Sequence, residues 1–84
     1  MDYQKGQIVL SRAGRDKGRF LAVVATSQGR VLVADGKEHR LAKPKAKNPK
    51  HLSGTCKVLA DEAFAQDSSL SRAIAACTAA PPTT

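Results

Sequence analysis

Aromatic residues are scarce in this 84-residue chain, which contains two phenylalanines, one tyrosine and no tryptophan. Proteins that bind single-stranded nucleic acids without sequence preference stack the bases on aromatic side chains. The basic part of the chain offers only Tyr3 and Phe20 for such stacking. Grooves that bind proline-rich peptides are also lined by aromatic side chains. The sequence therefore argues against both kinds of binding surface.

Long apolar runs are also absent. No segment approaches the roughly eighteen consecutive apolar residues that a transmembrane helix needs. The opening residues, Met1 to Lys5, are polar, and no apolar signal segment follows them. We therefore expect a cytoplasmic protein that does not associate with a membrane.

Cysteine is limited to Cys56 and Cys77, which allow one disulfide at most. In the reducing compartment expected here, both thiols should be reduced. A zinc site needs four ligands at close spacing, whereas the candidates His39, His51, Cys56 and Cys77 are spread along the chain and include no Cys-x-x-Cys or His-x-x-x-His pair. The sequence predicts neither a metal site nor a cofactor.

Basic residues outnumber acidic ones by fourteen to seven, which gives a net charge of +7. The surplus is uneven, because residues 1–57 carry thirteen Lys and Arg against four acids, whereas residues 58–84 carry one against three. A one-sided basic surplus is expected of a protein that binds a polyanion. The alternative is a solvated basic surface that only confers solubility.

Two apolar segments of strand length, Ile8–Leu10 and Phe20–Ala25, flank a polar loop near the start of the chain. The loop contains Gly14 and Gly18, and glycine tolerates the positive φ that a tight connection requires. The sequence therefore predicts a stiff hairpin that presents cations at its tip.

The tip of this loop mixes charges of both signs. Asp16 would repel a phosphate, so we expect it to brace the loop by a hydrogen bond or an ion pair with Arg15 or Arg19. The cations around Asp16 should then face outward. The alternative is a hydrophilic hairpin tip that binds nothing.

The same stretch resembles a KOW motif, a short glycine-marked β element found in several ribosomal proteins and transcription elongation factors. The residues that fit the motif are Gly6, Ile8, Val9, Leu10, Gly14, Gly18, Val23 and Val24. The resemblance to KOW-type large-subunit ribosomal proteins and their short bacterial relatives continues through Val31 to Gly36 and then Arg40, Pro44, Lys45, Lys47, Asn48, Lys50, His51 and Leu52. It covers residues 5–52 and implies a small SH3-like β-barrel that binds structured RNA, usually ribosomal RNA.

Strand and turn signals predict about five short strands in residues 1–59. Ser27 to Gly29 and Asp35-Gly36 are turn signals next to apolar, β-branched runs. Closure into a barrel would remove the exposed edges of so small a sheet. We therefore expect a mainly β protein built on one small barrel. The expected strands are Gln7–Ser11, Phe20–Thr26, Val31–Val33, Glu38–Leu41 and Thr55–Leu59.

The character of the sequence changes after residue 59, and residues 60–77 are expected to be helical. Asp61 to Ala65 can form one helical turn, with its acids favourably placed near the N-terminus. A second helix is expected from Ser69, capped by Ser68 or Ser69. Its apolar stripe, which should pack on the barrel, contains Leu70, Ala73, Ile74 and Cys77. Residues 78–84 are expected to form a flexible tail.

Residues 42–48 are expected to be extended but irregular, because Pro44 and Pro49 lack backbone donors and disfavour a helix before them. The lysines of residues 43–51 recur every two or three residues, which advances roughly 6.5 to 10 Å along an extended chain. Neighbouring phosphates are separated by a comparable distance. The alternative is a solvated, disordered connector. Asn48 and His51 could contact RNA, or could organise the segment through nearby backbone groups.

The candidate RNA-binding residues are the cations of the hairpin loop and of the basic run, with two polar neighbours. Lysine is a mobile point charge that suits phosphates of varied geometry, and arginine adds bidentate contacts. The set is Arg12, Arg15, Lys17, Arg19, Arg40, Lys43, Lys45, Lys47, Asn48, Lys50 and His51.

The case for an enzyme is thin, because nothing in the local sequence brings a nucleophile and a base together. Ser11 with His39 and Asp35, or a cysteine with His51, has the residue types of a nucleophile and its base, but no local motif places these residues together. We expect a monomer that binds structured RNA, by resemblance ribosomal RNA or the ribosome, without catalysis and without a small-molecule substrate. The alternative is a protein-interaction module, for example an adaptor in transcription or translation.

Overall fold

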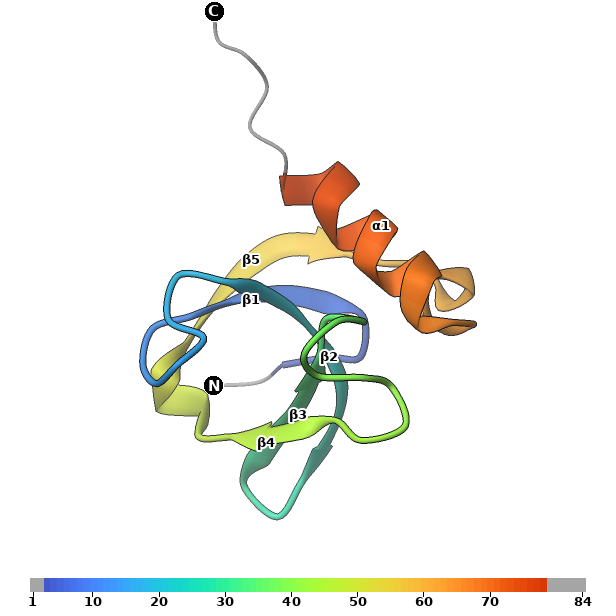
Figure 1. Ribbon diagram of the computed structural model, residues 1–84. Helices are drawn as coiled ribbons and strands as arrows, with labels where there is room; N and C mark the ends of the chain where they lie inside the picture. The colour runs from blue at the N-terminus through green and yellow to red at the C-terminus, as the bar shows by residue number, and fades with distance from the viewer. Residues whose placement is uncertain (1–2, 79–84) are drawn as a thin grey trace, which may run out of the picture.

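The computed structural model describes residues 3–78, which form one five-stranded antiparallel sheet and one α-helix. The sheet order is β4-β3-β2-β1-β5, and the sheet curls into a barrel-like fold compatible with an SH3-like barrel (Figure 1). The elements are β1 (Gln7–Ser11), β2 (Phe20–Ser27), β3 (Arg30–Ala34), β4 (Lys45–Lys47), η1 (Pro49–His51), β5 (Leu52–Val58), η2 (Asp61–Phe64) and α1 (Asp67–Thr78), where η marks a 3₁₀ turn.

The alternation of side chains along β2 divides the apolar residues between two clusters. Leu21 and Val23 point into the barrel, whereas Ala22 between them points to the outer face. Tyr3 closes the inner cluster, and its hydroxyl donates to the Leu52 carbonyl at 3.1 Å. Tyr3 therefore packs on the barrel. The inner cluster contains Tyr3, Val9, Leu21, Val23, Val31, Val33 and Leu52.

Helix α1 covers the outer cluster, as its apolar stripe predicted. Leu70 and Ile74 are buried against Ala22 and Ala34, whose small side chains let the helix approach the sheet. Phe20, Val24, Leu41, Leu59 and Phe64 pack around the edge of this contact. Burial of a large aliphatic side chain stabilises a fold by about 1.5–3 kcal/mol, so α1 contributes substantially to so small a domain.

The β2–β3 hairpin forms at the predicted turn. Gln28 and Gly29 both have positive φ, of 49° and 77°, and Ser27 pairs with Arg30 across the turn. Positive φ at both central residues matches the right-handed twist of the flanking strands.

The predicted fourth strand, Glu38–Leu41, is wrong. The Asp35 carboxylate accepts hydrogen bonds from the backbone N–H groups of Lys37 and His39 at 2.9 and 3.0 Å, and these bonds hold the segment as a turn. The fourth strand is instead β4, whose Lys45 pairs with Val33. Part of the segment expected to be irregular is thus a strand.

The helical part begins slightly earlier than predicted. The expected turn at Asp61 is confirmed as η2, and α1 starts at Asp67 instead of Ser69. Thr78 ends α1, and the rest of the expected tail lies outside the described residues. Among residues 3–78, no helix has the length and apolar character needed to cross a bilayer.

Candidate nucleic-acid interface

The loop between β1 and β2 is a closed, hydrogen-bonded structure that exposes its cations. Gly14 and Gly18 have φ of 86° and 88°, which confirms their expected role in the turn. Backbone bonds join Lys17 to Gly14 at 3.2 Å and Gly18 to Ser11 at 2.8 Å. Four exposed cations project from the loop: Arg12, Arg15, Lys17 and Arg19.

A buried polar cluster lies beneath this loop. Lys47 Nζ donates to Asp16 Oδ1 at 2.6 Å and to Ser11 Oγ at 3.0 Å, and Ser11 Oγ donates to Asp16 Oδ1 at 2.8 Å. Only 7% of Lys47 and 3% of Asp16 are exposed. Asp16 therefore braces the loop as expected, but through Lys47 and Ser11 and not through Arg15 or Arg19.

The register of β4 sets the direction of the Lys47 side chain, and the β1–β2 loop encloses its ammonium group. Lys47 pairs with Val31, whose side chain points into the barrel, so the Lys47 side chain lies on the same inward face. There it also donates to the Ala13 carbonyl at 3.1 Å. Lys47 was expected to face solvent and contact phosphate, and the structure contradicts this exposure because its ammonium group is enclosed by the loop.

The same contacts control the ionisation of Asp16. Burial alone would raise the pKa of its carboxyl group. Hydrogen bonds from Lys47 and Ser11, with the charge of Lys47, outweigh this effect and lower the pKa from 3.8 to about 2. Asp16 is therefore a carboxylate at neutral pH.

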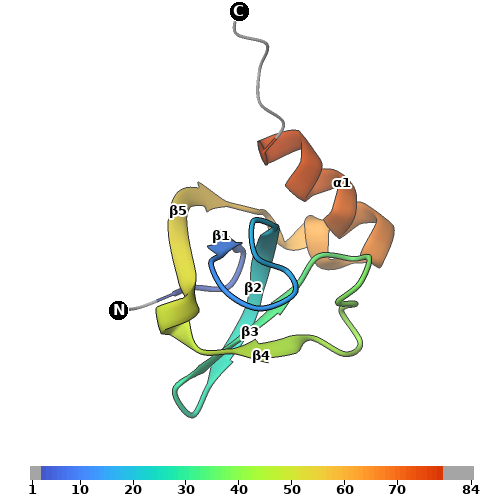
Figure 2. The same cartoon turned by 60° about the vertical axis from the view of Figure 1, so that its left-hand side comes forward.

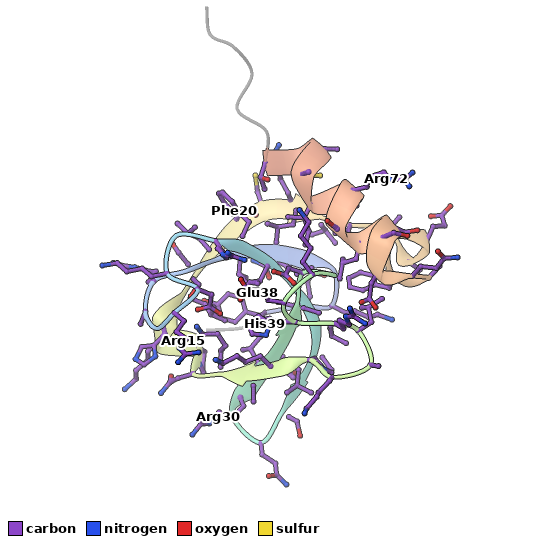
Figure 3. All side chains as sticks on the ribbon, viewed as in Figure 1. Arg15, Phe20, Arg30, Glu38, His39 and Arg72 are labelled. Carbon is purple, nitrogen blue, oxygen red and sulfur yellow. The ribbon has the colours of Figure 1, made fainter. Side chains whose placement is uncertain are left out.

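Two further pairs join the β1–β2 loop to the segment between β3 and β4. His39 Nε2 lies 3.4 Å from Asp16 Oδ2, a buried oxygen with no hydrogen-bond partner among the described residues. Arg19 forms an exposed salt bridge of 2.7 Å with Glu38. Glu38 and His39 belong to the loop that precedes β4, and Figure 3 shows them beside the barrel.

Element η1 lies alongside the β1–β2 loop, because the Arg12 N–H donates to the His51 carbonyl at 2.8 Å. Asn48 Oδ1 accepts the Lys50 N–H at 2.9 Å, so Asn48 organises this turn. Lys50 and His51 are exposed. We call the resulting group the loop–η1 surface; it contains Arg12, Arg15, Lys17, Lys50 and His51.

The other predicted site residues lie elsewhere. Arg40 and Lys43 are exposed in the segment between β3 and β4, which runs beside the start of α1 in Figures 1 and 2. Lys45 is exposed on β4, and Arg19 forms its salt bridge with Glu38. The fold therefore divides the predicted residues between the loop–η1 surface, the buried position of Lys47 and exposed positions elsewhere.

Sequence reasoning missed Arg30, which is exposed at the start of β3 (Figure 3). Arg30 and Pro49 line the same shallow hollow, so Arg30 borders η1. The sequence signal for Arg30 was its position directly after the Gln28-Gly29 turn. It begins β3, the strand that pairs with β4.

A serine beside a lysine can also serve as a nucleophile and its base. Ser11 is only 1% exposed, however, and Lys47 covers its hydroxyl. The geometry therefore indicates that this cluster braces the loop.

Among residues 3–78, no three His, Cys, Asp or Glu side chains are grouped in a way that could hold a metal ion. Cys56 is exposed and Cys77 is half-buried, and both thiols are free.

The fold and this surface define a small barrel-like β protein with a helix packed on its outer face and a braced cationic loop. Neither a scan of protein-family models nor a search of curated proteins found a match to the chain.

Proposed function

We propose that this protein binds structured RNA, without catalysis, through the loop–η1 surface. The observation that carries the proposal is the braced loop: Lys47, Asp16 and Ser11 fix its base, while Arg12, Arg15 and Lys17 remain exposed around it. Cations on a fixed frame lose less conformational freedom when they meet phosphates than cations on a mobile segment do.

The placement of the aromatic residues supports contact with phosphates and 2′-hydroxyls over base stacking. Tyr3 belongs to the inner cluster, and Phe20 and Phe64 pack against the outer cluster beneath α1. One buried ring and two partly buried rings offer little to a run of bases, which single-strand binders stack on aromatic side chains. A folded RNA recognised by shape fits this surface better.

The resemblance of residues 5–52 to KOW-type ribosomal proteins supports ribosomal RNA as the partner. On this proposal the protein is a monomeric, cytoplasmic, ribosome-associated factor. The resemblance rests on glycines that the fold uses at its turns, Gly14 and Gly18 among them.

The test is ultraviolet crosslinking in cells, followed by sequencing of the RNA bound to the protein. We expect enrichment of ribosomal RNA for the parent chain and a strong loss for Arg15→Gln/Lys50→Gln. The matched control is Lys5→Gln/Lys57→Gln, which removes two exposed cations outside the loop–η1 surface. RNA recovery no higher than background for the parent would refute the proposal and favour a protein-interaction module.

A further inference from the structure

Three exposed cations outside the loop–η1 surface gather near the N-terminal end of α1. Lys37 and Arg40, from the segment between β3 and β4, line one shallow hollow with Arg72 of α1. We call these three residues the α1-side surface. Figure 3 shows Arg72 on the outer side of α1, far from Arg15.

The hollow has a fixed shape because the segment before β4 is packed tightly on the helix. The Leu41 N–H donates to Asp67 Oδ1 at 2.7 Å. Gly36 lies so close to α1 that an added Cβ would overlap the Asp67 carbonyl oxygen. The three cations are therefore carried by two elements that are held against each other.

Positive charge in the hollow is poorly compensated. Within residues 3–78, no salt bridge includes Lys37, Arg40 or Arg72. Asp67 is the single acid that lines the hollow, and one of its oxygens already accepts the Leu41 N–H. Arg72 is also the only cation of residues 58–84. Its position beside two further cations raises electrostatic repulsion, which a bound polyanion would relieve.

We infer that the α1-side surface contacts the phosphates of a second segment of the RNA. This inference rests on the proposed function and extends it, because it adds α1 to an interface otherwise built from the barrel. Arg15 and Arg72 lie far apart in Figure 3, so we expect the footprint to divide into two patches. Arg40 and Arg72 provide planar guanidinium groups, which suit bidentate phosphate contacts.

The test is a salt titration of binding to purified large-subunit ribosomal RNA. Each phosphate contact contributes roughly 0.7 to 0.9 to the slope of log affinity against log salt concentration. We expect Arg40→Gln/Arg72→Gln to flatten the slope by about 1.4 to 1.8, and Arg40→Lys/Arg72→Lys to retain it. The control Lys5→Gln/Lys57→Gln should leave the slope at the parent value.

Chemical footprinting of the same complexes separates the two surfaces. We expect the parent to protect two RNA segments and Arg40→Gln/Arg72→Gln to lose one of them, while circular dichroism shows an intact fold. A slope and a footprint equal to those of the control would overturn this inference and leave the proposed function standing. A parent that binds none of the RNA would overturn both.

Discussion

Lys47 and Asp16 are the two residues on which the shape of the β1–β2 loop most depends. A buried ion pair is not by itself a strong source of stability, because desolvation of both charges opposes their attraction. Removal of one partner is costly, however, because the other charge is left buried without compensation. Here the pair joins β4 to a loop 31 residues away in the sequence. Its main effect is therefore on the conformation of the loop.

Substitution of Lys47 by methionine should destabilise the fold by about 3–5 kcal/mol, because it leaves the Asp16 carboxylate buried without its ammonium partner. Lys45→Met is the matched control, since Lys45 is exposed on the same strand and should change the stability by less than about 0.5 kcal/mol. Urea unfolding followed by circular dichroism measures both variants. Equal unfolding midpoints for the two would contradict the role assigned to the pair. In Lys47→Met/Asp16→Asn the loss should be smaller than the sum of the single losses.

The lowered pKa of Asp16 predicts a specific pH dependence of stability. A carboxyl group whose pKa is lower in the folded state stabilises the fold above its unfolded pKa of 3.8, and this contribution disappears as the pH falls toward about 2. The corresponding free energy is roughly 2 kcal/mol. Unfolding experiments on the parent and on Asp16→Asn should therefore show a stability difference that shrinks across this interval. Asp61→Asn, at an exposed acid on η2, should keep the parent's profile.

At the scale of elements, α1 has two faces with different roles. Ile74 is buried against the sheet, whereas Arg72, two residues earlier, lies on the opposite side of the helix and is exposed. The first face serves stability and the second is available to a ligand. The two roles can therefore be separated by substitutions on the same helix.

Truncation of Ile74 to alanine should destabilise the fold by about 2–5 kcal/mol, because it leaves a cavity between α1 and the sheet. Arg72→Ala should change the stability by less than about 0.5 kcal/mol, since its side chain is exposed. Thermal unfolding of the two variants measures the difference. An Ile74→Ala protein with the parent's melting temperature would show that α1 does not depend on this contact.

The elements that local sequence could predict are those defined by local bonds. Gln28 and Gly29 specify their own turn, and the spacing of Leu70 and Ile74 specifies one face of a helix. The position of β4 was not predictable in this way, because its three residues are a strand only through their pairing with β3. The inward direction of Lys47 depends on the register of β4 with β3, a tertiary feature with no local signal.

At the scale of the whole molecule, the fold sorts the basic residues by direction. The two-residue spacing of Lys45 and Lys47 predicted neighbouring phosphate contacts. In the structure this spacing puts both residues on one face of β4, and the ammonium group of Lys47 binds the Asp16 carboxylate. The predicted set could therefore be recognised as basic from the sequence, but its division between the loop–η1 surface, the α1 side and the barrel interior could not.

This division changes which variant tests the proposed function most directly. A combined substitution of the lysines in residues 43–50 would include Lys47 and would disturb the fold, so loss of binding would have two explanations. Arg15→Gln/Lys50→Gln removes only exposed charges of the loop–η1 surface. The slope of log affinity against log salt concentration should flatten by about 1.4 to 1.8, because each lost phosphate contact lowers the number of counterions released on binding.

The measurement is a salt titration with purified large-subunit ribosomal RNA, with circular dichroism to confirm the fold of each variant. Lys5→Gln/Lys57→Gln removes the same charge from exposed positions outside the surface and should keep the parent's slope. If both double variants flattened the slope equally, binding would depend on the net charge of the chain and not on the braced loop. A slope that changes only for Arg15→Gln/Lys50→Gln would locate the contacts on the loop–η1 surface, because the two variants have the same net charge.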